Sequence, residues 1–113
     1  SYFEIKAKAV KNIAPALAEA DLLVNASPIG MHPRTDESPL GKDARLKPHL
    51  VVYDLVYNPF ETKLIQTAKA AGCRAVSGLG MLVRQGVLAF AIWTGQDAPV
   101  EIMFKAAREA LGN

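Results

Sequence analysis

The stretch LVVYDLVY, residues 50–57, decides the fold. It opens with three consecutive aliphatic residues, so a strand formed here would be hydrophobic on both faces. A strand of this kind is typical of a parallel sheet that is covered on both sides. Asn58 and Pro59 follow directly and end the strand, because proline cannot donate to a sheet ladder. We therefore expect a short, buried, parallel strand in the middle of the sequence.

Two further short apolar runs flank this strand, and helical segments separate the three. Residues 21–25 (DLLVN) predict a strand before it, and residues 74–76 (RAV) predict a strand after it. Predicted helices span residues 2–11, 12–19, 61–72 and 79–93, and a last helix begins after Pro99. The alternation predicts an α/β fold: a partial Rossmann-like parallel sheet of about three strands, followed by two carboxyl-terminal helices. Such a sheet is about half of a doubly wound fold.

Two of the predicted helices have clear local signals. Glu61 and Thr62 open the first of them, and Gly72 closes it, as glycine commonly does after a last helical turn. The helix after Pro99 is amphipathic. Its predicted inner face carries Ile102, Met103, Ala106, Ala107 and Leu111.

Composition and charge exclude several classes of protein. The 113 residues include 13 basic and 11 acidic side chains mixed along the chain, so no basic stripe is present for nucleic acid. The one cysteine, Cys73, excludes an internal disulfide, and a lone thiol fits a cytoplasmic protein. No apolar run approaches the roughly 20 residues that span a bilayer, so we expect no membrane insertion. The chain begins with Ser1, and we expect it to start inside a longer protein.

Chemistry is expected at one edge of the sheet, because open parallel sheets bind ligands beyond the carboxyl ends of their strands. Three predicted loops lie at such ends: residues 25–31, 54–59 and 77–81. They offer the hydroxyl of Ser27, the phenol of Tyr57 and the bare backbone of Gly78. Gln85 lies one helical turn beyond Met81, so these two side chains share a helix face. The three loops and this face together predict a binding site.

Each of these polar residues also has a structural interpretation. Asn25 is a common turn former, and a tyrosine such as Tyr57 at a strand end is usually a half-buried packing residue. Gln85 is either a satisfied core amide or a ligand contact. Asp54 is favoured as a loop anchor or a cap over a catalytic acid.

Histidine and cysteine do not indicate metal binding or nucleophilic catalysis. His32 and His49 have no partners at ligand spacing, so no metal site is expected. Cys73 directly follows Gly72 and has no nearby histidine to activate it as a nucleophile.

Three motifs resemble those of the shikimate dehydrogenase family. NASPIGM at residues 25–31 resembles the N-A-T-P-x-G-M motif of that family, with serine where threonine is usual. DLVYNP at residues 54–59, with ET at residues 61–62, resembles D-x-x-Y-x-P-x-x-T. GLGMLVRQG at residues 78–86, with WTG at residues 93–95, resembles the G-x-x-M-L-x-x-Q-[GA] helix. The three occur in order, with compatible spacing, over most of the chain.

The resemblance implies an enzyme of aromatic amino-acid biosynthesis that reduces 3-dehydroshikimate to shikimate with NADPH, in two domains. It implies that residues 1–76 form the later half of the dinucleotide-binding domain. Residues 77–113 would then be helices that pack back on an amino-terminal substrate domain. The family's catalytic lysine–aspartate pair and glycine-rich loop have no match in this chain, so no catalytic residue is assigned to it. The chain alone is expected to be inactive and, lacking a partner for its apolar helices, to self-associate.

The resemblance also implies roles for individual residues. Tyr57 matches the tyrosine that hydrogen-bonds the substrate carboxylate, and Gln85 matches the glutamine that contacts the substrate hydroxyls. The positions implied in cofactor binding are the backbones of Leu55 and Gly78 at the nicotinamide carboxamide, Met81 near the ring, and Ala26 and Ser27 along the cofactor.

Two other functions remain open at this point. The same motifs are compatible with an NAD-dependent quinate/shikimate dehydrogenase. From another class, the chain is a non-catalytic interaction module that pairs with another protein through the apolar helices at residues 79–93 and 102–111.

Overall fold

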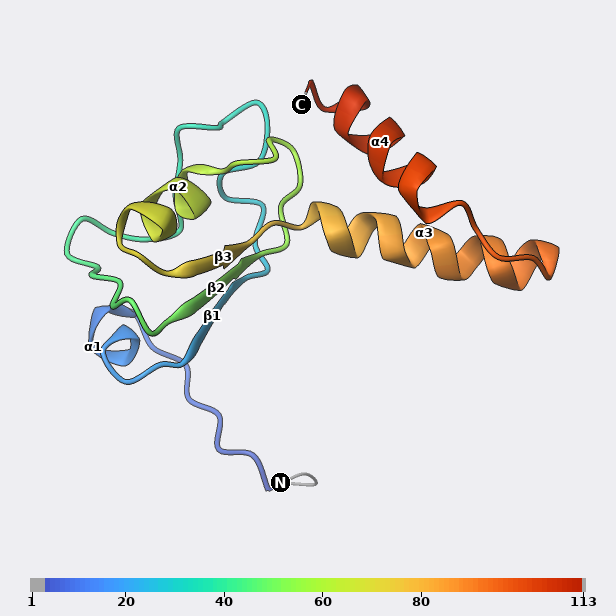
Figure 1. The fold of residues 1–113 in the computed structure, drawn as a ribbon. Coiled ribbons are helices and arrows are strands. Elements are labelled where there is room, and N and C mark those ends of the chain that lie inside the picture. The colour runs from blue at the N-terminus through green and yellow to red at the C-terminus, as the bar shows by residue number, and fades with distance from the viewer. Residues whose placement is uncertain (1–3, 113) are drawn as a thin grey trace.

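The computed structural model describes residues 4–112 and has an α/β architecture (Figure 1). Its elements are α1 (Ala14–Leu17), β1 (Leu22–Asn25), β2 (Val51–Asp54), α2 (Lys63–Ala70), β3 (Arg74–Val76), α3 (Leu79–Thr94) and α4 (Val100–Ala110). The strands are parallel and lie in the order β1-β2-β3. The predicted three-stranded parallel sheet and the two carboxyl-terminal helices are therefore confirmed.

Helices α1 and α2 lie on the same side of the sheet (Figure 1). The buried cluster between these layers consists of Leu17, Leu50, Val52, Leu64, Ala68 and Cys73. It draws on α1, β2 and α2, so burial of a few aliphatic side chains, each worth about 1.5–3 kcal/mol, joins the two helices to the sheet. This is the main core of the described residues.

The opposite side of the sheet is open in the part of the chain that the structure describes. Leu22 and Val24 of β1 are exposed, Leu22 with 56% of its surface accessible. They pair in register with Val51 and Tyr53 of β2, so all four side chains point to this side. Apolar side chains on both faces of a strand predict that other elements pack on both sides of the sheet. In the described residues, helices pack on one side only.

Helix α2 begins and ends as its sequence predicts. The Thr62 hydroxyl accepts a hydrogen bond from the Ile65 N–H at 3.2 Å, which satisfies a free donor of the first turn. Gly72 follows the helix with a φ of +80°, a left-handed conformation that glycine adopts without strain. The chain then returns directly into β3.

Helices α3 and α4 form an arm that projects from the sheet (Figure 1). Where they cross, a side chain at Gly86 would lie 3.1 Å from the Met103 Cε, so glycine allows close packing. The half-buried side chains of α4 are Val100, Met103, Phe104 and Ala107, with Leu111 just beyond its end. The predicted inward placement of Ile102 and Ala106 is wrong, because both lie on the exposed side of α4; Ile102 is 67% exposed.

The helix predicted over residues 2–11 is also wrong where it can be judged. Residues 4–10 have no regular secondary structure, and residues 2 and 3 lie outside the described part. Ile5 and Val10 are exposed, and a helix of this length is marginal in water by itself. Within residues 4–112, no helix has both the length and the hydropathy needed to cross a membrane.

Candidate functional site

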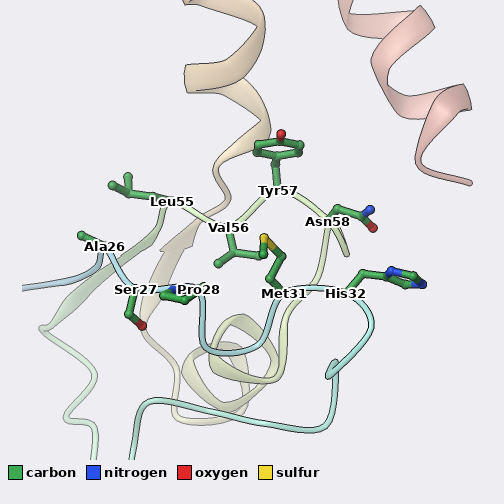
Figure 2. A pocket seen from close by; sticks show the side chains of 9 residues that line it. All are labelled: Ala26, Ser27, Pro28, Met31, His32, Leu55, Val56, Tyr57 and Asn58. Atoms are coloured by element: carbon green, nitrogen blue, oxygen red, sulfur yellow. The ribbon is translucent and has the colours of Figure 1, made fainter.

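Two loops at the carboxyl edge of the sheet lie side by side. Residues 26–32 follow β1, and residues 55–58 follow β2. Backbone bonds tie them at both ends: the Leu55 N–H donates to the Asn25 carbonyl at 3.1 Å, and the His32 N–H donates to the Asn58 carbonyl at 2.8 Å. Between them is a cavity of about 440 Å³, which we call the loop cavity (Figure 2). It is lined by Ala26, Ser27, Pro28, Met31, His32, Leu55, Val56, Tyr57 and Asn58.

Tyr57 is the most prominent polar group of the loop cavity. Its ring stands out from the loop, away from Ser27 and Pro28 (Figure 2). The side chain is 41% exposed, so it is neither buried in the core nor fully in solvent. A tyrosine in this position presents its hydroxyl to a ligand without first breaking a packed core.

The loop after β1 is a turn organised by Asn25. The Asn25 Oδ1 accepts from the Ser27 N–H at 3.1 Å and from the Ser27 hydroxyl at 2.6 Å. The Asn25 Nδ2 donates to the Ile29 carbonyl at 3.1 Å. The structural interpretation of Asn25 as a turn former is confirmed. The Ser27 hydroxyl proton is engaged within this turn, so the hydroxyl meets a ligand as an acceptor unless the turn opens.

Asp54 lies beneath both loops and is completely buried. Its carboxylate accepts from the Asn25 Nδ2 at 3.1 Å, the Val56 N–H at 3.0 Å and the Thr62 hydroxyl at 2.6 Å. The prediction that Asp54 anchors a loop is confirmed. In the sequence, Thr62 stands at a predicted helix start and in one motif with Asp54, but their hydrogen bond was not predicted, because it depends on the tertiary fold.

A second cavity, which we call the helix cavity, lies between the open side of the sheet and α3. It measures about 450 Å³ and is lined by Tyr53, Val76, Ser77, Gly80, Met81, Arg84, Gln85 and Leu88. Met81 and Gln85 are both exposed. The Gln85 amide donates to the Leu82 carbonyl of its own helix at 2.9 Å. Gln85 is therefore not a core amide, which removes one of its two interpretations.

Gly78, at the start of α3, packs against the loop after β2. A side chain at this position would lie 2.2 Å from the Leu55 carbonyl oxygen and 3.0 Å from the Val56 oxygen. The Gly78 N–H also donates to the Val56 carbonyl at 3.3 Å. The absence of a side chain therefore lets the start of α3 pack directly on the backbone of the loop after β2.

Six of the seven predicted site residues line one of the two cavities, and Gly78 lines neither. Those that line the loop cavity are Ala26, Ser27, Leu55 and Tyr57. Those that line the helix cavity are Met81 and Gln85. Sequence reasoning did not place His32 or Arg84 at these cavities, since neither position has a local signal for such a role.

Metal and thiol chemistry find no support in the described residues. Within residues 4–112, no group of three or more His, Cys, Asp and Glu side chains lies close enough to hold a metal ion. Cys73 is buried, and its thiol donates to the Lys47 carbonyl at 3.2 Å. Burial raises the pKa of the Cys73 thiol, which disfavours the reactive thiolate.

This chain has a parallel sheet with a cavity between its strand-end loops. The same arrangement is typical of α/β proteins that bind ligands beyond the carboxyl ends of their strands. The model of the family described as "Shikimate 5'-dehydrogenase C-terminal domain" matches residues 78–108. A shikimate dehydrogenase (NADP(+)) from Methanopyrus kandleri is 50% identical over 111 residues, which are 95% of this chain and 38% of the relative. The chain is therefore similar, over nearly all of its length, to the carboxyl-terminal portion of shikimate dehydrogenases.

Solved structures show the same similarity. A shikimate dehydrogenase in complex with NADP+ is 43% identical, with a TM-score of 0.78 over 84% of this chain and 33% of the other. The enzyme of Thermus thermophilus in complex with NADP(H) and shikimate is 41% identical, with a TM-score of 0.75 over 84% of this chain and 36% of the other. The chain thus spans little more than a third of the length of these relatives.

Proposed function

We propose that this chain forms the carboxyl-terminal part of an NADP-dependent dehydrogenase that interconverts 3-dehydroshikimate and shikimate. The observation that supports this most is the loop cavity, where Tyr57 and the turn of Ser27 meet at the carboxyl edge of a parallel sheet. A relative named for this activity is 50% identical over 111 residues, and similar solved structures are described as complexes with NADP, one of them also with shikimate. On this proposal, residues 1–76 form the later half of the dinucleotide-binding domain, and residues 77–113 form helices that pack back on an amino-terminal substrate domain.

The cofactor would lie along the loops and the start of α3. Ala26 and Ser27 would border it, the backbones of Leu55 and Gly78 would hold the nicotinamide carboxamide, and Met81 would pack near the ring. The fit is supported by Gly78, because only a residue without a side chain allows α3 to approach the Leu55 carbonyl so closely. When bound, the nicotinamide supplies the hydride that the reaction transfers.

The substrate would be held by the two exposed polar side chains. The Tyr57 hydroxyl would donate to the substrate carboxylate, and the Gln85 amide would bind its hydroxyl groups. Gln85 is free to turn toward a ligand, since its present bond is to an exposed carbonyl of its own helix. Fixing the substrate from one side and the cofactor from the other brings the reacting atoms into near-attack geometry. Proton transfer is assigned to groups outside this chain.

The test is to join this chain to the amino-terminal part of the Methanopyrus kandleri relative, in place of the matching 111 residues. We call the product the reconstructed enzyme. We expect it to oxidise shikimate with NADP+, whereas the isolated chain is expected to show no turnover. Absence of turnover in a correctly folded reconstructed enzyme would overturn the proposal and favour the interaction-module hypothesis. Parallel assays with NAD+ and with quinate test the alternative dehydrogenase.

Two substitutions connect the activity to the proposed residues. Tyr57→Phe removes a hydrogen bond to a charged group, so we expect kcat/KM for shikimate to fall by about tenfold to a hundredfold. Gln85→Ala should lower kcat/KM by about tenfold. Gln66→Ala, at an exposed glutamine of α2 that lines neither cavity, is the control and should leave kcat/KM unchanged. An unchanged kcat/KM in Gln85→Ala would remove Gln85 from the site.

A further inference from the structure

Asp54 is a completely buried carboxylate for which the proposed reaction has no direct use. The ion pairs recorded among residues 4–112 do not include it. Its carboxylate is instead held by three hydrogen-bond donors that come from three different segments: Asn25, Val56 and Thr62. A carboxylate is costly to bury without such donors, and bonds to an ionised acceptor are stronger than those between neutral groups.

The contacts of Asp54 extend into both loops of the loop cavity. Through the Asn25 amide it connects to the turn that carries Ser27, because the same amide binds the Ser27 N–H, the Ser27 hydroxyl and the Ile29 carbonyl. Through the Val56 N–H it holds the residue next to Tyr57. The two walls of the cavity are therefore fixed to one buried group.

Thr62 closes the second loop at its far end. Its hydroxyl donates to the Asp54 Oδ2 and accepts from the Ile65 N–H, so it connects the carboxylate to the first turn of α2. The loop that carries Tyr57 starts directly after Asp54 and leads to Thr62. Both ends of this loop are thus held at the same carboxylate, while Tyr57 itself stays exposed.

We propose that Asp54 is a positioning residue for the dehydrogenase reaction. Through Asn25, the Val56 N–H and Thr62, it sets the relative placement of the cofactor-binding turn and the loop of Tyr57. The inference rests on the proposed function. An aspartate is required because all three partners donate, and an asparagine has one acceptor oxygen in place of two. Asp54 does not contact the reacting atoms in this scheme and acts only through the loops.

The first test measures activity in the reconstructed enzyme. Asp54→Asn should lower kcat by about tenfold or more, since small errors of placement in near-attack geometry are costly to rate. Thr62→Val should lower kcat in the same direction, and Thr62→Ser, which keeps the hydroxyl, should restore it to within about twofold. Thr67→Val removes an exposed hydroxyl from the same helix and should leave kcat unchanged. KM for shikimate should change less than kcat in each variant.

A residue that only stabilises the fold would behave differently. Asp54→Asn and Thr62→Val would then lower the unfolding temperature but leave kcat unchanged when assayed well below that temperature. That result in the folded variants would overturn the proposal. If the unsubstituted reconstructed enzyme has no turnover, the proposed function fails, and the second test still decides whether Asp54 positions the loops.

The second test needs no activity and uses the 113-residue chain. Amide hydrogen exchange of Asp54→Asn should be faster by about tenfold at Ser27 and Val56, whose N–H groups are held by Asn25 and Asp54. Exchange at Val52, in the buried centre of β2, should not change if the variant stays folded. Thr62→Val should accelerate exchange at Val56, and Thr67→Val should not. Unchanged exchange at Ser27 and Val56 in Asp54→Asn would show that the carboxylate does not hold the loops.

Discussion

Gly78 and Gly80 both stand at the start of a predicted helix, and the sequence does not distinguish them, yet the structure gives them different surroundings. A side chain at Gly78 would lie 2.2 Å from the Leu55 carbonyl oxygen, whereas one at Gly80 would meet nothing within 4 Å. Gly78→Ala should therefore lower the free energy of unfolding by about 2–3 kcal/mol, because the backbone of Leu55 cannot move aside. Urea unfolding of the 113-residue chain, followed by circular dichroism, measures this change.

Gly80→Ala is the matched control for that experiment. Since Gly80 lies in the first turn of α3 with open space around it, alanine should be neutral or stabilising by up to about 1 kcal/mol. Equal effects of the two substitutions would contradict the close approach of α3 to the loop after β2.

Cys73 provides a prediction for the dependence of stability on pH. Burial raises the pKa of its thiol above the ordinary value of 9.0, so the thiol stays protonated in the folded chain while it ionises in the unfolded chain. The contribution of the protonated thiol to the free energy of unfolding is therefore complete below pH 9 and is lost as the pH rises above that value. The urea midpoint of the chain should fall between pH 8 and pH 10 more steeply than that of Cys73→Ala. Identical slopes would contradict a raised pKa.

Single residues also show where sequence reasoning works. Asn25 and Asp54 were predicted as a turn former and a loop anchor because such polar side chains beside a strand end bind nearby backbone groups. Their direct bond, between residues 29 positions apart, was not predictable, since it depends on the pairing of β1 with β2. For Gln85, exposure excludes the core interpretation, and exposure is a property of the packed structure; its contact with a ligand stays a prediction.

At the scale of elements, the strands and α2 were predictable because their signals are local. An apolar run, a threonine cap and a closing glycine identify them without knowledge of the rest of the fold. Residues 4–10 show the limit of that approach, because helical spacing alone does not form so short a helix when Ile5 and Val10 are exposed. The predicted inner face of α4 was wrong for a related reason. The face that turns inward is set by contact with α3, and it contains Phe104 in place of Ile102.

Phe104 should be the residue that docks α4 on α3. Its ring lies 5.9 Å from the Arg84 guanidinium of α3 and 5.5 Å from that of Arg108 on α4. Each such contact contributes about 0.5–1 kcal/mol at an exposed site, in addition to the apolar packing of the ring. Phe104→Ala should therefore accelerate amide exchange in α4 by about tenfold. Ile102→Ala, on the exposed side of the same helix, should have little effect, and an equal acceleration would place the contact face elsewhere.

At the scale of the whole molecule, the shape explains why the predicted site residues line two separate cavities. The radius of gyration is 16.4 Å, compared with about 13 Å for a compact chain of this length, because α3, α4 and the segment before α1 extend away from the sheet. The sequence placed all site residues at one edge but did not reveal the direction of α3. Because α3 runs in that direction, Tyr57 lines the loop cavity and Gln85 lines the helix cavity. A ligand that contacts both side chains must therefore extend from one cavity to the other.

The projecting arm leads to the last prediction, self-association of the isolated chain. Leu88, Ile92 and Trp93 of α3 are exposed, the last two by 80% and 82%, and such a group of large apolar side chains favours contact with another apolar surface. Size-exclusion chromatography with light scattering should show a mass that rises above the monomer as concentration increases. Ile92→Glu should restore the monomer by placing a charge in the contact, whereas Gln96→Glu, at an exposed polar position past the end of α3, should not. A monomer at every concentration would contradict this prediction, because the exposed apolar side chains of α3 would then not drive association between copies of the chain.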